Sequence, residues 1–206
     1  MLIVGLTGSI GMGKSTVAAR FRTAGIAVLD VDEVVHQLYA GAAVPLIEHA
    51  FPGSTRDGVV DRPKLASILA SAPDGFRRLE AIVHPLVRAA EQEFLAREFE
   101  DGARVAILEI PLLFETGGDR LVDTVVVVSA SAEAQQRRVL ERPGMTEARL
   151  AQLLARQMPD AEKRRRADFV VDTNGTIAET EAQVDAIVAA IAEREGGAYH
   201  RHWVLP

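Results

Sequence analysis

A glycine-rich motif near the N-terminus constrains the fold of this chain more than any other feature. Residues 8–15 read Gly-Ser-Ile-Gly-Met-Gly-Lys-Ser and match the pattern G-x-x-x-x-G-K-[ST] at every fixed position. An apolar run over residues 2–6 precedes the motif, and a helical pattern over residues 16–23 follows it. This order of strand, glycine loop and helix predicts a phosphate-binding loop that opens an α/β domain.

Two physical properties make such a loop a receptor for phosphate. Its glycines let successive backbone N–H groups turn toward phosphate oxygens, and the helix after it adds the partial positive charge of its N-terminus. Lys14 would reach the β- and γ-phosphates, and the Ser15 hydroxyl would bind Mg²⁺. The alternative is a chance glycine turn, and the complete octapeptide in its expected context argues against it. The motif therefore predicts a nucleoside triphosphate with Mg²⁺ as the ligand.

Short β-branched runs alternate with helical patterns along the rest of the chain. The runs are continuously apolar, as in strands that are buried on both faces of a parallel sheet. This alternation predicts a doubly wound α/β fold, of the three-layer α/β/α type with a five-stranded parallel sheet. The expected strands cover residues 2–6, 27–30, 105–110, 124–129 and 169–172.

The chain is expected to form one phosphate-loop domain over residues 1–206, with two additions. The long gap between the second and third strands predicts a helical insertion over residues 44–101. Its expected helices cover residues 63–71, 75–83 and 85–100. A second, mobile element is expected over residues 131–166, after the fourth strand. The tail over residues 196–206 is polar and expected to be flexible, although Trp203 could dock.

Composition and charge limit the classes of function that remain. A net charge of −6 argues against a general nucleic-acid binder, whereas the nine Arg or Lys and four acids of residues 137–166 suit a compact polyanion such as a nucleotide. The chain has no cysteine, which excludes disulfides and thiolate metal sites, and no stretch approaches the length of a membrane span. We therefore expect a cytoplasmic protein, monomeric or weakly homo-oligomeric, that acts on a small molecule without a nucleic-acid or membrane partner.

Two carboxylates, Asp30 and Asp32, lie at and just beyond the end of the second expected strand. Ligands of parallel α/β sheets bind at the carboxyl ends of the strands, so a carboxylate there could accept the proton of a hydroxyl that attacks the γ-phosphate. A carboxylate at a strand end could equally cap the next helix. The residues alone leave open which of the two aspartates caps and which one is catalytic.

Arginines in the basic segment supply the complementary charge. Arg138 and Arg142 are four residues apart and would share a helix face, while Arg137 points elsewhere. Guanidinium groups on a helix that closes over the site could stabilise the transferred phosphoryl group and exclude water. The basic run over residues 163–166 is expected to be a solvated helix face instead.

At this point the chain resembles the dephospho-CoA kinases, over about residues 1–190. These kinases use ATP and Mg²⁺ to phosphorylate the 3′-hydroxyl of the dephospho-CoA ribose, the last step of coenzyme A synthesis. The resemblance rests on the order and spacing of the phosphate loop, Leu29-Asp30-Val31-Asp32, Asp61-Arg62, His84-Pro85, Pro111 to Glu115, the arginine pair with Arg142, Gln157 and Ala167-Asp168.

The resemblance implies a role for each matching residue. Asp32 would act as the base for the acceptor hydroxyl, and Arg142 would be the lid arginine that faces the nucleotide. Lys14 would join them in catalysis. The acceptor would contact Asp32 and the residues Arg62, His84 and Arg138. The nucleotide would contact Gly11, Met12, Gly13, Lys14, Ser15, Thr16, Arg142 and Asn174, with Ser15 also at the metal.

Some positions keep a second interpretation. His84-Pro85 could simply begin a helix with Pro at its first position. The segment from Pro111 to Glu115 could be structural, with Glu115 or Glu109 near the metal. Met12 stands where the family has a small residue and would crowd the loop slightly. Thr173 stands where asparagine is frequent, so either Thr173 or Asn174 could contact adenine.

Two other functions are compatible with the motif. Another small-molecule kinase would share the loop and fold but not the acceptor pocket. A nucleotide-dependent switch would bind ATP without depending on Asp32. The paired aspartates and the arginine-rich segment count against the switch.

Overall fold

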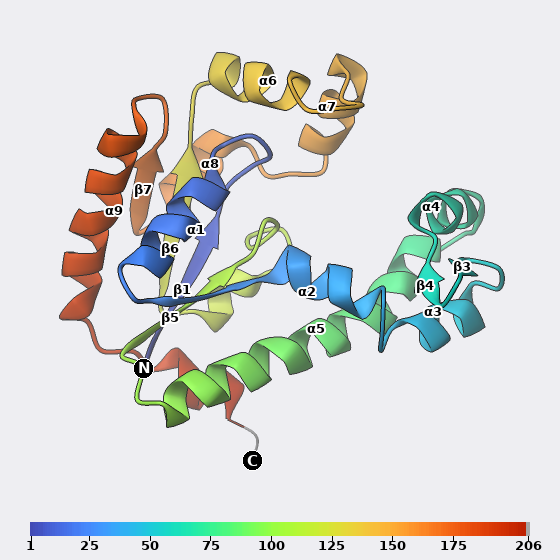
Figure 1. Ribbon diagram of the computed structural model, residues 1–206, viewed down its shortest axis with the longest axis horizontal. Coiled ribbons are helices and arrows are strands. Elements are labelled where there is room, and N and C mark those ends of the chain that lie inside the picture. Colours follow the sequence, from blue (N-terminus) through green and yellow to red (C-terminus); the bar gives the residue numbers. More distant parts are fainter. Residues whose placement is uncertain (205–206) are drawn as a thin grey trace. The chain divides into compact units, whose positions relative to one another are not determined.

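Five strands form one sheet in the order β2–β5–β1–β6–β7 (Figure 1). Their bounds are β1 (Leu2–Thr7), β2 (Ala27–Asp30), β5 (Val105–Glu109), β6 (Thr124–Ser129) and β7 (Phe169–Asp172). In this computed structural model, which describes residues 1–204, β1 pairs in parallel with β5 and β6, and β6 pairs in parallel with β7. All five strands expected from the sequence are present, and the parallel α/β fold with flanking helices is confirmed.

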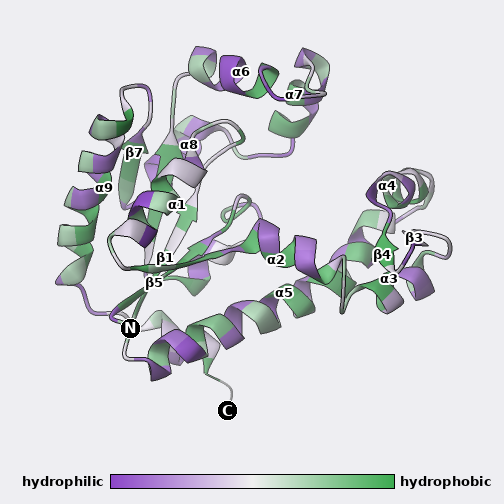
Figure 2. Ribbon diagram, viewed as in Figure 1, coloured by the Kyte–Doolittle hydropathy of each residue, from purple (hydrophilic) through white to green (hydrophobic). Residues whose placement is uncertain are grey.

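The central strands are buried because both of their faces are covered. Every residue of β1 and β6 is buried, and Figure 2 shows these strands as predominantly hydrophobic. Leu6 of β1 lies opposite Val126 of β6 on one side and opposite Glu109 of β5 on the other. Burial on both faces explains why the strand residues are continuously apolar and do not alternate.

Five helices belong with this sheet. They are α1 (Lys14–Thr23), α6 (Ala132–Leu140), α7 (Glu147–Leu154), α8 (Asp160–Arg166) and α9 (Ile177–Ala192). Helices α1 and α9 pack against each other, α9 also contacts β7, and α8 contacts β6 (Figure 1). Thr176 begins α9 with a capping box, in which its side chain and that of Glu179 each bond the other's backbone.

The chain divides into two compact units. The first contains residues 1–29 and the chain from Leu95 onward, and the second contains residues 30–94. The second unit holds α2 (Val31–Leu38), α3 (Val44–Ala50), α4 (Arg62–Ser71), most of α5 (Gly75–Glu100), and a hairpin of β3 (Thr55–Arg56) and β4 (Val59–Val60). It has its own hydrophobic core, built around Ile47, Phe51 and Leu65. The helical insertion expected over residues 44–101 falls mainly in this unit.

The structure corrects the helices expected around Pro85. The sequence predicted two helices, with Pro85 at the start of the second, but α5 is one continuous helix of 26 residues with Pro85 inside. A proline in a helix interior lacks the N–H that would bond the carbonyl four residues earlier. The apolar positions on both sides of Pro85, such as Val83 and Leu86, pack into the core of the second unit and hold the helix together.

The C-terminal tail docks onto the first unit as far as it is described. A short π-helix (Tyr199–Trp203) stacks the ring of Tyr199 on Phe99, and Trp203 Nε1 donates to the carbonyl oxygen of Leu121 at 2.8 Å. The Asp123 carboxylate accepts hydrogen bonds from the backbone N–H groups of residues 197 and 198. The docking considered for Trp203 is thus confirmed. Flexibility of the tail in solution stays a prediction, and its residues 205–206 lie outside the described residues.

None of the described helices has the length and apolar composition that a membrane span requires.

Candidate active site

The loop after β1 has the conformation that its glycines allow. Gly11 and Gly13 have φ angles of 78° and 88°, in the left-handed region that favours glycine. A Cβ atom at Gly11 would lie 2.5 Å from Cγ2 of Val139, so neither the backbone nor the space around it accepts a side chain. Gly13 leads directly into α1, which begins at Lys14. This is the geometry of a helix N-terminus that receives phosphate.

Met12 does not crowd the loop as expected. Its side chain is buried in the core, and its Sδ atom accepts a hydrogen bond from the backbone N–H of Ala130 at 3.1 Å. An unbranched thioether can turn away from the loop and fill a gap in the core. Any contact of Met12 with a nucleotide would therefore come from its backbone.

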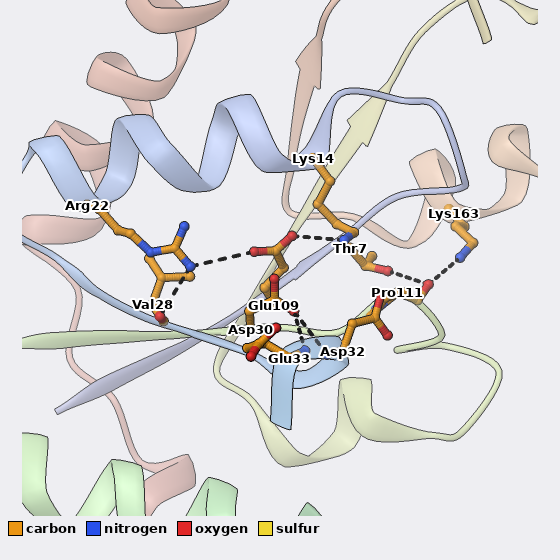
Figure 3. A network of polar contacts seen from close by, with 10 residues as sticks. All are labelled: Thr7, Lys14, Arg22, Val28, Asp30, Asp32, Glu33, Glu109, Pro111 and Lys163. Carbon is orange, nitrogen blue, oxygen red and sulfur yellow. Dashed lines mark hydrogen bonds and ion pairs between the residues drawn. The ribbon is translucent and has the colours of Figure 1, made fainter. Parts of the chain in front are cut away.

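The loop lysine lies in a network of opposite charges at the end of β5. Lys14 Nζ is 2.9 Å from Oε1 of Glu109, and Arg22 Nη2 is 3.9 Å from Oε2 of the same carboxylate (Figure 3). The Glu109 side chain is only 3% exposed, so these two cations compensate a buried negative charge. Ser15 and Thr16 follow Lys14 in the first turn of α1, and both are exposed.

The structure decides which aspartate after β2 caps the next helix. Asp30 Oδ1 accepts hydrogen bonds from the backbone N–H groups of Asp32 and Glu33, at 3.0 and 3.2 Å (Figure 3). Asp30 is thus the N-cap of α2, and its carboxylate is used to satisfy the helix end. Asp32 lies one residue inside the helix with an exposed side chain. Of the two carboxylates, Asp32 is the one that does not cap the helix.

On the second unit, Arg62 at the start of α4 contacts two side chains from α2 and its C-terminal end. Arg62 Nη2 is 3.2 Å from Nδ1 of His36, and its guanidinium lies 5.2 Å from the centre of the Tyr39 ring. Burial raises the pKa of Tyr39, and the positive charge of Arg62 partly offsets this effect. His84 is exposed on α5, and among the contacts of the described residues none joins it to Arg62.

Sequence reasoning did not select His36 or Tyr39. The signal was present, because Asp32, His36 and Tyr39 are spaced i, i+4 and i+7 along α2 and its last turn. Residues with this spacing share one helix face. The face that bears the candidate base therefore also bears the partners of Arg62.

The arginines of the basic segment play different parts from those expected. Helix α6 ends at Leu140, so Arg142 lies beyond it and does not share a helix face with Arg138. Arg138 donates hydrogen bonds to the carbonyl oxygens of Gly11 and Thr173 and to the Thr173 hydroxyl, and thus connects the phosphate loop to the end of β7. Arg137 and Arg142 are exposed. The helix-face argument was wrong because the helix ends before the second arginine.

Thr173 and Asn174 both have structural partners. The Thr173 side chain is buried, and its hydroxyl donates to the carbonyl oxygen of Met12 at 2.8 Å. Asn174 is exposed, accepts a hydrogen bond from the backbone N–H of Ser131 and donates one to Asp172. Thr173 therefore supports the phosphate loop. A contact of Asn174 with adenine stays a prediction.

A buried lysine corrects the interpretation of the basic run as a solvated face. The side chain of Lys163 is fully buried and lies 2.9 Å from Oε1 of Glu115, whereas the three arginines after it are exposed. Glu115 Oε1 also accepts the backbone N–H of Met158, and Lys163 donates to the carbonyl oxygen of Pro111 (Figure 3). Glu115 can neutralise Lys163 locally, so the lysine can be buried. These contacts indicate a structural role for Glu115.

Taken together, these features define a class of protein. A parallel sheet, a glycine loop ending in lysine at a helix N-terminus and an exposed carboxylate just after β2 are typical of a phosphate-loop kinase. A family model described as dephospho-CoA kinase matches residues 2–179. The chain belongs to the dephospho-CoA kinase family.

Individual relatives agree with this membership. A dephospho-CoA kinase of Rhizobium etli is 59% identical over 194 residues, which cover 94% of this chain and 96% of the relative. The solved structure of TT1252 from Thermus thermophilus superposes with a TM-score of 0.81 at 37% identity, and covers 92% of this chain and 97% of its own. A dephospho-CoA kinase from Campylobacter jejuni is 23% identical with a TM-score of 0.69, covers 93% of this chain and 97% of its own, and supports the fold.

Proposed function

We propose that this protein transfers the γ-phosphoryl group of ATP to the ribose 3′-hydroxyl of dephospho-CoA, which gives coenzyme A and ADP. Membership of a kinase family sets the class of reaction. The observation that carries the residue assignment is the division of tasks after β2, where Asp30 caps α2 and Asp32 does not. Because Asp30 serves as the N-cap, Asp32 is the better candidate of the two for the base.

In this proposal Asp32 accepts the proton of the 3′-hydroxyl as the oxygen attacks the γ-phosphorus. The bond between the γ-phosphorus and the bridging oxygen breaks, and ADP leaves with that oxygen. Phosphoryl transfer depends mainly on positioning and charge stabilisation, so the base serves to orient the hydroxyl as well as to deprotonate it. A positioned base contributes about 10²- to 10⁴-fold.

The backbone of residues 11–16 would hold the phosphates, and Lys14 would exchange Glu109 for phosphate oxygens. The exchange is feasible because Arg22 remains beside the other Glu109 oxygen at 3.9 Å. If this buried carboxylate lost every neighbouring cation, the folded protein would be destabilised by about 3–5 kcal/mol. Arg22 thus allows Lys14 to leave its partner.

The residues present fit a bound Mg²⁺. The Ser15 hydroxyl is exposed in the first turn of α1 and offers a hard oxygen ligand, and Mg²⁺ in kinases completes its shell with phosphate oxygens and water. Within residues 1–204 there is no group of three or more His, Asp or Glu side chains that could hold a metal ion. When bound, the ion neutralises phosphate charge.

The remaining residues are assigned to the acceptor and to the lid. Arg62 and His84 would bind dephospho-CoA, and both are exposed on the second unit. Arg142, exposed after α6, would approach the phosphates when residues 131–166 close, and Asn174 would contact the nucleotide. Arg138 would bind substrate through the guanidinium N–H groups that its contacts to Gly11 and Thr173 leave over. Those contacts support a role for Arg138 in holding the loop.

The setting of the reaction is also part of the proposal. We expect the protein to act in the cytoplasm on this small molecule, as a monomer or weak homo-oligomer, without nucleic acid or membrane as partner. Size-exclusion chromatography with light scattering, with and without substrates, tests the oligomeric state.

A coupled assay of ADP release tests the reaction directly. The protein is given MgATP with and without dephospho-CoA, and the acceptor is followed by mass spectrometry. The proposal predicts ADP only when the acceptor is present, together with the mass of one phosphate added to the acceptor. ADP formation with a nucleoside or another metabolite, and none with dephospho-CoA, would assign a different small-molecule kinase. ATP binding without any transfer would favour the switch.

A further inference from the structure

Ile10 of the phosphate loop is held through both of its backbone polar groups by two glutamines. Its carbonyl oxygen accepts a hydrogen bond from Nε2 of Gln135 at 2.7 Å, and its N–H donates to Oε1 of Gln157 at 3.2 Å. A backbone carbonyl can only accept and a backbone N–H can only donate. The orientation of each glutamine amide is therefore fixed by its partner.

The two glutamines lie within residues 131–166 and flank residues 141–156, which we call the lid segment. Gln135 lies in α6 and is 7% exposed, and Gln157 lies in the turn between α7 and α8. Between them runs the part of the chain that carries Arg142. Both ends of this segment are thus attached to the same loop residue, Ile10. A movement that displaces either glutamine has to act on Ile10 or break the hydrogen bond between them.

The neighbouring loop carbonyls are anchored in the same way. The carbonyl oxygen of Gly11 accepts from Arg138, and that of Met12 accepts from the Thr173 hydroxyl. In a trans peptide the N–H points opposite to the C=O of the same peptide unit. Donors that hold the carbonyls of Ile10 and Met12 from outside the loop therefore turn the N–H groups of Gly11 and Gly13 the opposite way. This fixes the direction in which the loop presents its donors.

We propose that Gln135 and Gln157 are positioning residues that couple the lid segment, residues 141–156, to the phosphate loop. They hold the loop carbonyls and N–H groups in the arrangement that binds phosphate. They also keep both ends of the lid segment in a fixed position relative to that loop. The inference rests on the proposed function, because the lid and loop act on the same ATP. Gln157 is one of the residues on which the family resemblance rests, but sequence reasoning gave neither glutamine a role.

Four variants test the donor and acceptor roles. Gln157→Glu keeps an acceptor for the Ile10 N–H, whereas Gln135→Glu removes the donor and places a carboxylate against the Ile10 carbonyl. Both Glu variants add one negative charge beside Ile10, so any repulsion of ATP by the added charge should be similar in the two. Gln135→Met and Gln157→Met keep the side-chain volume and remove the hydrogen bond. Gln152→Met, on the exposed face of α7, is the control for a glutamine change in the lid.

The KM for ATP and kcat at saturating dephospho-CoA are measured for each variant, with thermal unfolding to confirm the fold. We expect both Met variants and Gln135→Glu to lose roughly 10- to 100-fold in kcat/KM for ATP, the scale of a small misplacement of reacting groups. Gln157→Glu should keep at least about tenfold more activity than Gln135→Glu. Equal losses in the two Glu variants, or Met variants within about twofold of wild type, would overturn the inference.

Coupling to the lid has its own measurement. The rate of ATP hydrolysis without acceptor, divided by the rate of phosphoryl transfer with acceptor, should rise several-fold in the Met variants. A lid segment that is displaced relative to the loop excludes water less well. An unchanged ratio would overturn the coupling. MgATP affinity by calorimetry needs no acceptor, so it still tests the glutamines if the wild-type protein fails to phosphorylate dephospho-CoA.

Discussion

The two compact units present their candidate functional residues in opposite ways. In the first unit, Lys14 is paired with the buried Glu109, and the loop carbonyls of Ile10 and Met12 are held by side chains from α6 and the end of β7. In the second unit, the candidate residues Asp32, Arg62 and His84 are all exposed. The candidate nucleotide-binding residues are thus held by neighbouring side chains, whereas the candidate acceptor-binding residues lie at the surface.

This difference has a consequence for binding. A preorganised loop loses little conformational entropy when it takes up phosphate, whereas exposed arginine and histidine side chains lose about 0.5–1.5 kcal/mol each when they are immobilised. Substitutions in the first unit should therefore affect ATP binding and stability together. Substitutions of exposed residues in the second unit should affect catalysis or acceptor binding with little change in stability.

The largest expected effect separates the two aspartates after β2. Asp32→Asn should lower kcat by roughly 10²- to 10⁴-fold and leave MgATP affinity nearly unchanged, because it removes a base and not a phosphate ligand. Steady-state kinetics and calorimetry measure the two quantities. Asp30→Asn is the matched control, since asparagine caps a helix about as well as aspartate. Similar losses of kcat in both variants would show that the carboxylates act on the helix and not on the hydroxyl.

Lys14→Ala should act on the other unit and change two quantities at once. It removes the cation that would bind phosphate, so MgATP affinity should fall and turnover should drop by about 10²- to 10³-fold, the scale for loss of one charge-stabilising donor. It also leaves Glu109 with Arg22 alone, so thermal stability should decrease. Isothermal titration and thermal unfolding measure these effects. Wild-type turnover in this variant would rule out the phosphate-loop assignment.

Lys163 offers a contrast with Lys14, because its ion pair is structural. Lys163→Met should lower the free energy of unfolding by about 3 kcal/mol, since it leaves the Glu115 carboxylate without its buried partner. Denaturant unfolding measures the loss. Lys163→Met combined with Glu115→Gln should recover part of it. If the double variant is as unstable as the single one, packing and not charge accounts for the effect.

The smallest effect concerns Glu91, a buried carboxylate of α5. Burial raises its pKa from 4.5 to about 7, against the opposing effect of Arg88. The folded protein therefore holds this proton more tightly than the unfolded chain. The protonated Glu91 carboxyl therefore adds to the free energy of unfolding. This contribution is fully present below pH 4.5 and is lost as the pH rises through about 7.

Glu91→Gln should therefore be more stable than wild type at pH 8.5, by roughly 1–3 kcal/mol, and the difference should shrink toward pH 5. Chemical denaturation across this pH range measures it. A difference that does not change with pH would mean that Glu91 does not titrate between these values.

Much of the first unit could be predicted from the sequence. The five strands and the phosphate loop are local features, because continuous apolar runs and obligatory glycines determine them without knowledge of distant partners. The second unit was harder. A proline inside α5 was taken as a boundary, yet packing of apolar residues on both sides keeps the helix continuous. The short hairpin of β3 and β4 was not among the elements expected from the sequence.

For the site, the sequence by itself determined the residue types and their order: the loop lysine, two carboxylates after a strand and arginines after β6. Only the tertiary structure decided how they are used. It made Asp30 a cap, paired Lys14 with Glu109, buried Lys163 against Glu115 and brought two glutamines, 125 and 147 residues away in sequence, to Ile10. Hydrogen bonds and ion pairs act over a few ångströms in space, and their long-range partners are set by how the strands and helices pack.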